Sequence, residues 1–531
     1  MSGFSRTRLT IVAVTLAVVA AAGIGLRMRS RAAAAALLPP LPDLAGQPAA
    51  VVDHVKSADA AARRDPGSAD AVGALGMAYH ADLFYDAAAA AYRAAARVAP
   101  DDWRWSYLSA LVSLERGESA AAATRLRAIV AANPGMTLAW LRLGDAEFKQ
   151  ARDAEADEAY AKAEAVQASP GAAGSSAAAG PARRDTMPVA AYATLGRARV
   201  ALQQGQLERA RQTLEALVAR VPRLGVAHRL LADVDERLGD ADKAARHLAR
   251  AAALPAYNGA PDPMQDALAR ESRRSVLLLK QASAADLTRD REWREFLVRR
   301  ALEFDAANPD VVYEMGALLQ QLKQPAAALP YFERHLGMVD DDQQTLVQIG
   351  KCYIDLGRLA EAEAALQRAL ALADDAVGEY NLGYVLEQTG RSSEAETRYR
   401  RAIALNPGLA SAHTNLGTAL AGRGRVDEGA AHLAEAARLA PGSAAARNNL
   451  GAVFLQQRQV ERAAREFRLA LDLNPDYADA HANLGSALAQ RGAYREALRE
   501  FDEALRIDPH HAGAGANRQA VLARVQVEAP R

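Results

Sequence analysis

Apolar residues recur through most of the chain at spacings of three and four, with polar residues between them. In the segment 460–473, for example, Ala463, Phe467, Ala470 and Leu471 follow this rule. The spacing places one apolar stripe on a helix, and a neighbouring helix must cover that stripe. A first helix around Gly451, a turn near 456–460 and this second helix therefore form one predicted unit.

The predicted unit repeats with a fixed period in the C-terminal half. The tripeptide Asn-Leu-Gly occurs four times there at a constant spacing, with its glycines at Gly383, Gly417, Gly451 and Gly485. A proline follows each unit at the same spacing, at Pro407, Pro441, Pro475 and Pro509. The residue before a proline is disfavoured in a helix, so each second helix ends there. A repeat unit as long as the distance in sequence from Gly383 to Gly417 is typical of a solenoid.

Glycine has two different roles in these predicted units. A glycine inside a helix costs about 1 kcal/mol relative to alanine, so its recurrence in the first helix predicts close contact with a neighbouring helix. A second set, at Gly357, Gly390, Gly424 and Gly492, falls between the paired helices. We expect these glycines to adopt the left-handed conformation of a helix C-terminal cap.

Together these features resemble the tetratricopeptide repeat (TPR), a helix-turn-helix unit with this period. One clear match comprises Trp140, Leu143, Gly144, Ala156, Tyr160 and Ala163. Another comprises Leu75, Gly76, Tyr79, Ala88, Tyr92, Ala95 and Pro100. The resemblance implies an all-α fold, a right-handed superhelical solenoid of about twelve units. The residues themselves add an N-terminal hydrophobic segment before the repeats.

The same period divides the chain into parts. The predicted parts are a membrane anchor or signal segment (1–31), a tether and capping helix (32–67), an N-terminal TPR array (68–168), a flexible linker (169–188), degenerate TPR units (189–308), a regular C-terminal TPR array (309–511) and a capping helix with a tail (512–531). The degenerate units contain a Pro/Gly-rich insertion at 256–264.

Charge and motifs exclude several functions from the prediction. The 64 basic and 64 acidic residues cancel, whereas a dedicated nucleic-acid surface needs an excess of Lys and Arg. No zinc-protease motif, phosphate-binding loop or serine nucleophile elbow is present. The single cysteine, Cys352, lies on an apolar stripe and is interpreted as a core residue. We therefore expect no enzymatic activity, cofactor, metal or small-molecule substrate.

The segment from Leu9 to Leu26 carries no charged residue and follows Arg6 and Arg8. Its length lies at the lower limit for a membrane-spanning helix. The run of alanines at 20–22 also fits a signal-peptidase site, although several arginines follow at once. We expect a single-pass anchor with the repeats outside the cytoplasm, and a cleaved secretory signal is the alternative.

Partner binding is predicted on the first helices, which line the concave side in the TPR family. Two residues before each repeated glycine lie Asn381, Asn415, Asn449 and Asn483. An asparagine amide both donates and accepts, so a row of them suits an extended peptide backbone. The row is similar to the asparagine ladder of O-linked N-acetylglucosamine transferases, whose catalytic domain this chain lacks. The alternative interpretation is that asparagine is simply the common TPR residue at this position.

The position three residues before each glycine completes the predicted surface, with Tyr380, Thr414 and Asn448. A clamp for chaperone C-terminal carboxylates would need lysines there, so that partner is not expected. The sequence thus predicts a non-enzymatic scaffold for protein or peptide partners, tethered to or exported across a bacterial membrane. Two alternatives stay open: an envelope-assembly or secretion accessory protein that binds polysaccharide or lipid chains, and a regulator of a separately encoded enzyme.

Overall fold

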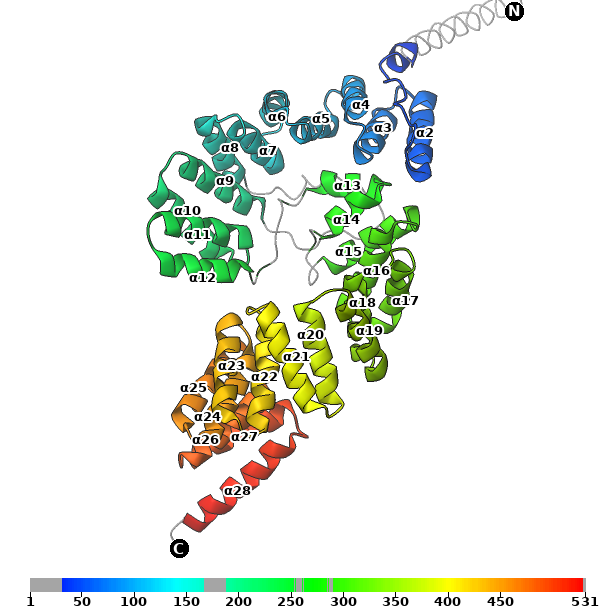
Figure 1. Ribbon diagram of the computed structural model, residues 1–531. Helices are drawn as coiled ribbons and strands as arrows, with labels where there is room; N and C mark the ends of the chain where they lie inside the picture. The colour runs from blue at the N-terminus through cyan, green and yellow to red at the C-terminus, as the bar shows by residue number, and fades with distance from the viewer. Residues whose placement is uncertain are drawn as a thin grey trace, which may run out of the picture. The chain divides into compact units, whose positions relative to one another are not determined.

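A computed structural model describes residues 31–166, 188–252, 262–283 and 290–528, together with Leu254, Ala260 and Ala285. Within these residues all regular elements are helices, which confirms the predicted all-α class. The chain divides into two compact units, Met1–Glu314 and Met315–Arg531, and each is described by itself (Figure 1). The predicted anchor Leu9–Leu26 and nearly all of the predicted linker 169–188 lie outside the described residues.

The first unit is built from the following helices: α2 (Ala49–Arg64), α3 (Ala69–Ala81), α4 (Tyr85–Val98), α5 (Trp103–Glu115), α6 (Ser119–Ala132), α7 (Thr137–Phe148), α8 (Asp153–Ala165), α9 (Val189–Gln203), α10 (Leu207–Arg220), α11 (Gly225–Arg237), α12 (Ala241–Ala252), α13 (Pro263–Glu271), α14 (Ser275–Ser283) and α15 (Arg291–Phe304).

Helix α16 (Pro309–Gln321) spans the division between the units. The second unit continues with α17 (Pro325–Leu336), α18 (Gln343–Asp355), α19 (Leu359–Leu372), α20 (Ala376–Gln388), α21 (Ser392–Leu405), α22 (Ala410–Gly422), α23 (Val426–Leu439), α24 (Ala444–Gln456), α25 (Val460–Leu473), α26 (Ala478–Gln490), α27 (Tyr494–Ile507) and α28 (Ala512–Glu528).

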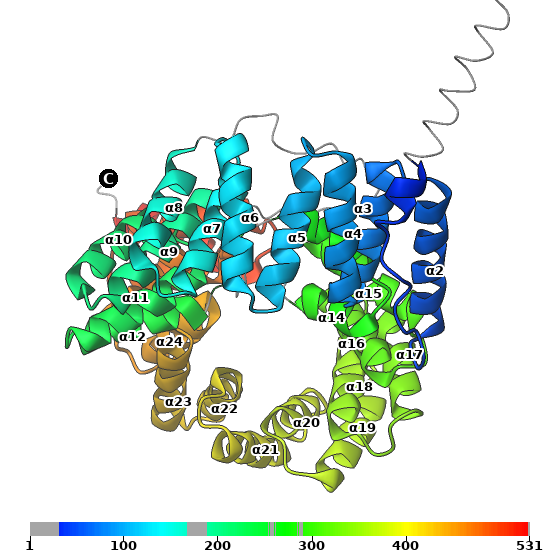
Figure 2. The same cartoon turned by 90° about the horizontal axis from the view of Figure 1, so that it is seen from above.

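The regular repeats have nearly constant dimensions. In α22 and α23 the first helix has 13 residues and the second has 14, and the next repeat copies both lengths. Within the second unit, the first helices α18, α20 and α22 follow the inner side of the curve, and their partners α19, α21 and α23 follow the outer side (Figure 2). Side chains of the first helices are therefore the ones that face the inner surface.

In most repeats a glycine of the first helix faces a large side chain at a fixed position of the second helix. A Cβ added to Gly451 would lie 2.7 Å from Cε1 of Phe467, and one added to Gly485 would lie 2.7 Å from Cε1 of Phe501. The same contact recurs at Gly76–Tyr92, Gly144–Tyr160, Gly316–Phe332, Gly350–Leu366, Gly383–Tyr399 and Gly417–Leu433. Glycine is therefore required for these two helices to approach each other, as its recurrence predicts.

Tyr160 makes this contact twice. Its ring lies against Gly144 of its own repeat and also against Gly196 of α9, where an added Cβ would lie 2.5 Å from the ring. Tyr160 is 1% exposed. Helices α8 and α9 are thus stacked directly on each other, although the residues between Val166 and Pro188 separate them in the sequence.

The turn between paired helices uses the left-handed backbone region at one fixed position. Glycine occupies it in several repeats, for example Gly390 with φ of 80° and Gly424 with φ of 82°. Four repeats place another residue at the equivalent position: Leu83, Ala151, Lys323 and Arg458, with φ between 56° and 68°. Because a side chain in this region costs roughly 1–2 kcal/mol, these repeats carry local strain that their neighbours lack.

Residues 31–48 are not a free tether. Leu38 is 9% exposed and belongs to the same buried cluster as Val51 and Val55 of α2. The guanidinium of Arg31 donates to the carbonyl of Arg64, and that of Arg63 donates to the carbonyl of Pro39 at 3.0 Å. The chain before α2 therefore runs along this capping helix.

Helix α13 differs most from the expectation. The sequence predicts a Pro/Gly-rich interruption through Met264, but the helix already begins at Pro263. Asp262 caps it by accepting a hydrogen bond from the backbone N–H of Met264 at 3.1 Å. Proline at the first helical position fits because its missing N–H needs no partner there.

Among the described residues no helix is long and apolar enough to cross a membrane.

We expect Gly451→Leu to destabilise the second unit by about 1–3 kcal/mol or more, because the new side chain overlaps Phe467. Gly442→Leu is the matched control, since nothing lies within 4 Å of a Cβ added at Gly442. Urea unfolding measures the difference, and hydrogen exchange should locate the loosening in α24 and adjoining repeats. Uniform loosening of every repeat, or equal effects of the two variants, would contradict a solenoid.

Candidate partner-binding surfaces

The seven residues proposed from the sequence form a row on successive first helices of the second unit. We call this row the C-terminal ladder; it consists of Tyr380 and Asn381 on α20, Thr414 and Asn415 on α22, Asn448 and Asn449 on α24, and Asn483 on α26. Neighbouring first helices are in contact along this part of the unit. Ladder residues of adjacent repeats are therefore close enough to contact each other.

Hydrogen bonds connect ladder residues of adjacent repeats. Nδ2 of Asn483 donates to Oδ1 of Asn448 at 2.9 Å. Nδ2 of Asn415 lies 3.4 Å from the hydroxyl oxygens of both Tyr380 and Tyr399. The bonds Asn483–Asn448 and Asn415–Tyr380 each join a residue two positions before one glycine to a residue three positions before the preceding glycine. Part of the amide capacity is thus used to join the repeats.

Exposure along the ladder is lower than a solvent-facing row would give. Asn381 is 8% exposed and Asn448 is 6% exposed, and the remaining ladder residues are half-buried. Asn415, Asn449 and Asn483 are among the half-buried residues, so part of each of them stays accessible.

Asn381 is the exception within the row. Its Nδ2 is buried without a hydrogen-bond partner. The position that pairs with it, three residues before Gly350, is held by Val347, which is 5% exposed. An apolar side chain cannot accept the bond that Asn448 and Tyr380 accept elsewhere. The amide nitrogen of Asn381 therefore makes no hydrogen bond to the preceding repeat.

A second surface lies on the first helices α3, α5 and α7, which we call the N-terminal docking face. A segment of the same chain, residues 262–274, is bound there, and we call it the internal segment. The hydroxyl of Tyr107 donates to Oδ2 of Asp262 at 2.6 Å, and Nη2 of Arg142 lies 3.3 Å from the same oxygen. The side chain of Asp262 is fully buried and that of Arg142 is 15% exposed.

This carboxylate is held at the positions that define the ladder. Arg142 lies two residues before Gly144, and Tyr107 lies three residues before Ala110, which takes the place of the glycine one period earlier. Burial alone lowers the pKa of Arg142, but the adjacent Tyr107 and Asp262 raise it above its ordinary value. Burial and the charge of Asp262 raise the pKa of Tyr107. Both groups therefore keep their protons as donors to the carboxylate.

The other end of the internal segment is bound at the end of α3. Oδ1 of Asp82 accepts a hydrogen bond from the backbone N–H of Arg273 at 3.0 Å. The backbone carbonyl of Asp82 accepts one from Nε of Arg274 at 2.8 Å. His54 bridges the two parts, with Nδ1 3.0 Å from Asp82 and Nε2 3.3 Å from Glu271. Burial opposes its charge, but these two bonds raise the pKa of His54.

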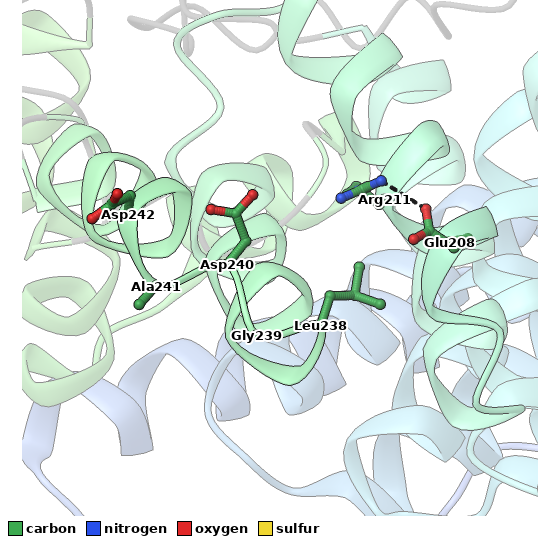
Figure 3. A pocket seen from close by; sticks show the side chains of 7 residues that line it. All are labelled: Glu208, Arg211, Leu238, Gly239, Asp240, Ala241 and Asp242. Carbon is green, nitrogen blue, oxygen red and sulfur yellow. Dashed lines mark ion pairs between the residues drawn. The ribbon is translucent and has the colours of Figure 1, made fainter.

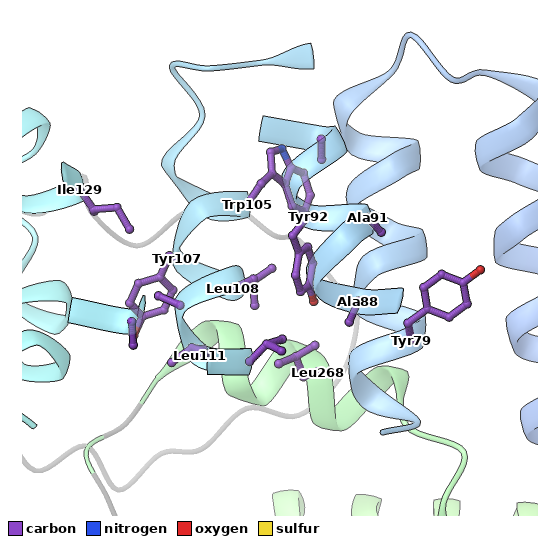
Figure 4. Packing of buried hydrophobic residues seen from close by; sticks show 14 of the residues in the cluster. Tyr79, Ala88, Ala91, Tyr92, Trp105, Tyr107, Leu108, Leu111, Ile129 and Leu268 are labelled. Carbon is purple, nitrogen blue, oxygen red and sulfur yellow. The ribbon is translucent and has the colours of Figure 1, made fainter. Parts of the chain in front are cut away.

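Between these polar ends the contact is apolar. Leu268 of α13 is 7% exposed and belongs to the cluster that contains Leu75, Leu108 and Leu111 (Figure 4). Met264 packs against the edge of that cluster. Helix α13 therefore docks by one central leucine with a charged contact at each end.

Sequence reasoning did not find the internal segment. Tyr107 and Asp262 are 155 residues apart, and no period relates α13 to the repeats. The available signal was local: Asp262 followed by Pro263 is a helix start, and Ala267, Leu268 and Ala269 are apolar. That signal indicates a helix but not the surface that binds it.

Two surface depressions lie away from both the C-terminal ladder and the N-terminal docking face. One is an open, polar hollow at the turn between α11 and α12, where Glu208 pairs with Arg211 at 2.9 Å beside Asp240 and Asp242 (Figure 3). Another lies over Leu450 and Phe454 and is lined by four arginines, Arg438, Arg447, Arg462 and Arg465. Within the described residues no group of three His, Cys, Asp or Glu side chains is placed to hold a metal ion.

Family models assign the repeats. Models described as tetratricopeptide repeat match residues 83–135, 110–173, 175–225, 195–261, 341–407, 380–444 and 448–512, which together make up more than half of the chain. The chain belongs to the tetratricopeptide repeat family. This confirms the resemblance seen in the sequence. No curated protein matches this chain.

Solved structures of similar proteins include other TPR proteins. YrrB, described as a TPR protein with an unusual peptide-binding site, shares 24% identity over 34% of this chain and 95% of its own, with a TM-score of 0.28. The APC/C hetero-tetramer Cut9–Hcn1 shares 15% identity over 86% of this chain and 96% of its own, with a TM-score of 0.37. MamA shares 23% identity over 30% of this chain and 95% of its own, with a TM-score of 0.28. Similarity at this level says nothing about what this chain binds.

Asn483→Leu should cost about 0.5–1.5 kcal/mol, because it removes the bond to the buried amide of Asn448. The same substitution at Asn381 should be neutral or stabilising, because it removes a buried donor that has no partner. Urea unfolding of the two variants measures the contrast. An equal loss in both would show that the hydrogen bonds between repeats do not matter to the ladder.

Proposed function

We propose that this TPR protein is a non-enzymatic scaffold that binds protein or peptide partners along the inner face of its first helices. The C-terminal ladder is the proposed contact surface. Its half-buried amides retain donors and acceptors beyond those that join the repeats, and an amide suits the alternating N–H and C=O groups of a peptide. Its side chains carry no charge, which suits recognition of backbone rather than of a charged ligand.

The observation that carries this proposal is the internal segment. In the first unit, the two ladder positions held by Tyr107 and Arg142 already bind a peptide segment, through the carboxylate of Asp262. The second unit repeats the same two positions with neutral residues, for example Tyr380 and Asn415. The first helices of this chain therefore have a surface that suits peptide binding, and the side chains at these positions set its chemistry.

We also propose that the segment Leu9–Leu26 tethers the repeats to a bacterial membrane. Support comes from its uncharged length and the preceding arginines. The tether would enter the folded array at Arg31, which is bonded to the end of α2.

The triple change of Asn415, Asn449 and Asn483 to alanine should weaken partner binding roughly tenfold or more, because each lost hydrogen bond is worth about 0.5–1.5 kcal/mol. The partner is first captured by crosslinking in cells with the unaltered chain and then measured by titration. Circular dichroism checks that helicity is kept.

The matched control changes Asn406 and Asn474 to alanine. Both end a second helix, and the Oδ1 of each accepts a backbone N–H two residues on, at 3.0 and 3.3 Å. These two variants remove a similar bond away from the ladder and should bind normally. A partner that binds the triple variant as tightly as the original would overturn the ladder proposal.

Deletion of residues 1–30 should release a folded, soluble array from membranes, because the described contacts of the array begin at Arg31. The full-length chain should stay with membranes after carbonate washing. Release of the full-length chain by the wash, or a mature chain that starts near Gly23, would replace the anchor with a peripheral protein or a cleaved signal.

A further inference from the structure

The internal segment resembles a ligand more than a part of the repeat stack. Helix α13 has nine residues, and an isolated helix shorter than about 12 residues is not stable in water. Its helical form therefore depends on the surface to which it is docked. That surface is formed by first helices. In the second unit, the first helices also form the face proposed for partner binding.

The contact is dominated by charge at both ends. Asp262 is bound by Tyr107 and Arg142, and Glu271 by His54. The carboxylate of Asp262 is fully buried, whereas the side chain of Glu271 is 45% exposed. A buried ion pair gives little net stability compared with apolar residues of the same size, because both charges lose their hydration. In some proteins such pairs instead select one sequence over another.

The internal segment also leaves part of the site unused. Nε of Arg142 is buried and has no hydrogen-bond partner. Nη2 of the same side chain reaches the neutral Oε1 of Gln265 only at 3.4 Å. A guanidinium binds carboxylates best through two parallel bonds. Nη1 of Arg142 also lies 3.7 Å from Oδ2 of Asp145 on its own helix. A carboxylate in place of Gln265 would therefore add a charged acceptor only on the Nη2 side of this guanidinium.

We propose that the N-terminal docking face is a binding site for a short helix of a partner protein, and that residues 262–274 are an internal competitor that occupies it. The partner helix begins with an aspartate cap followed by proline, carries an acidic residue three positions after the aspartate and buries a leucine six positions after it. This inference goes beyond the proposed function, because it concerns a different face of the chain from the C-terminal ladder.

The test uses a fluorescein-labelled peptide with the sequence of residues 260–276 and measures its anisotropy on titration with the full chain. A released chain carries Asp262→Asn and Leu268→Ala, which detach its own segment. The released chain should bind the peptide at least tenfold more tightly than the unaltered chain, whose docking face is occupied. A peptide with Gln265→Glu should bind more tightly still.

Two controls define the site. A peptide that carries Asp262→Asn and Leu268→Ala should not bind, and Arg142→Ala in the released chain should abolish binding of the original peptide. The triple asparagine change in the C-terminal ladder should leave peptide binding unchanged. Failure of the peptide experiment would therefore leave the proposal for the ladder standing, and failure of the ladder experiment would leave this one standing.

Four results would overturn the inference. The released chain keeps its helicity but binds no peptide, or it binds the altered peptide equally well. Hydrogen exchange shows that α3, α5 and α7 unfold in the released chain, which makes the segment an integral part of the array. The unaltered chain forms dimers in which the segment of one copy occupies the face of another, and the occupant is then a second copy.

Discussion

The contact between a glycine of the first helix and a ring or leucine of the second sets the geometry of the repeat. With a Cβ less than 3 Å from the facing side chain at Gly451 or Gly485, the two helices would have to separate. Their spacing fixes where the next first helix can pack, and so fixes which residues share the inner face. The ladder positions lie two and three residues before that glycine, so their alignment follows directly from this contact.

The period makes this part of the architecture predictable. Asn-Leu-Gly at constant spacing indicates the helix pairs, their turns and the common face of Asn415, Asn449 and Asn483. It does not indicate how deeply each amide is buried, because that depends on the residue opposite in the preceding repeat. Val347 leaves Asn381 without a partner, whereas Asn448 gives one to Asn483. The sequence pattern is the same in both cases, and only the packed helices distinguish them.

The docking of α13 is beyond sequence reasoning for a different reason. Helix periodicity reports on neighbours within a few tens of residues, but Asp262 meets Tyr107 across 155 residues. The substitutions in the two halves nevertheless follow a common logic. Where the ladder positions hold Tyr107 and Arg142 they bind a carboxylate, and where they hold asparagines they are neutral. One backbone geometry thus presents two different chemistries along a single chain.

Tyr160, which lies between Gly144 and Gly196, shows that two repeats stay stacked although a long stretch of sequence separates α8 from α9. The free energy needed to close such a stretch grows only with the logarithm of its length, by about 0.6 kcal/mol for each doubling. Insertions there are therefore inexpensive as long as the ring and its two glycines are kept. The register of the stack at this join is thus set by the ring contact and not by the length of sequence between the two helices.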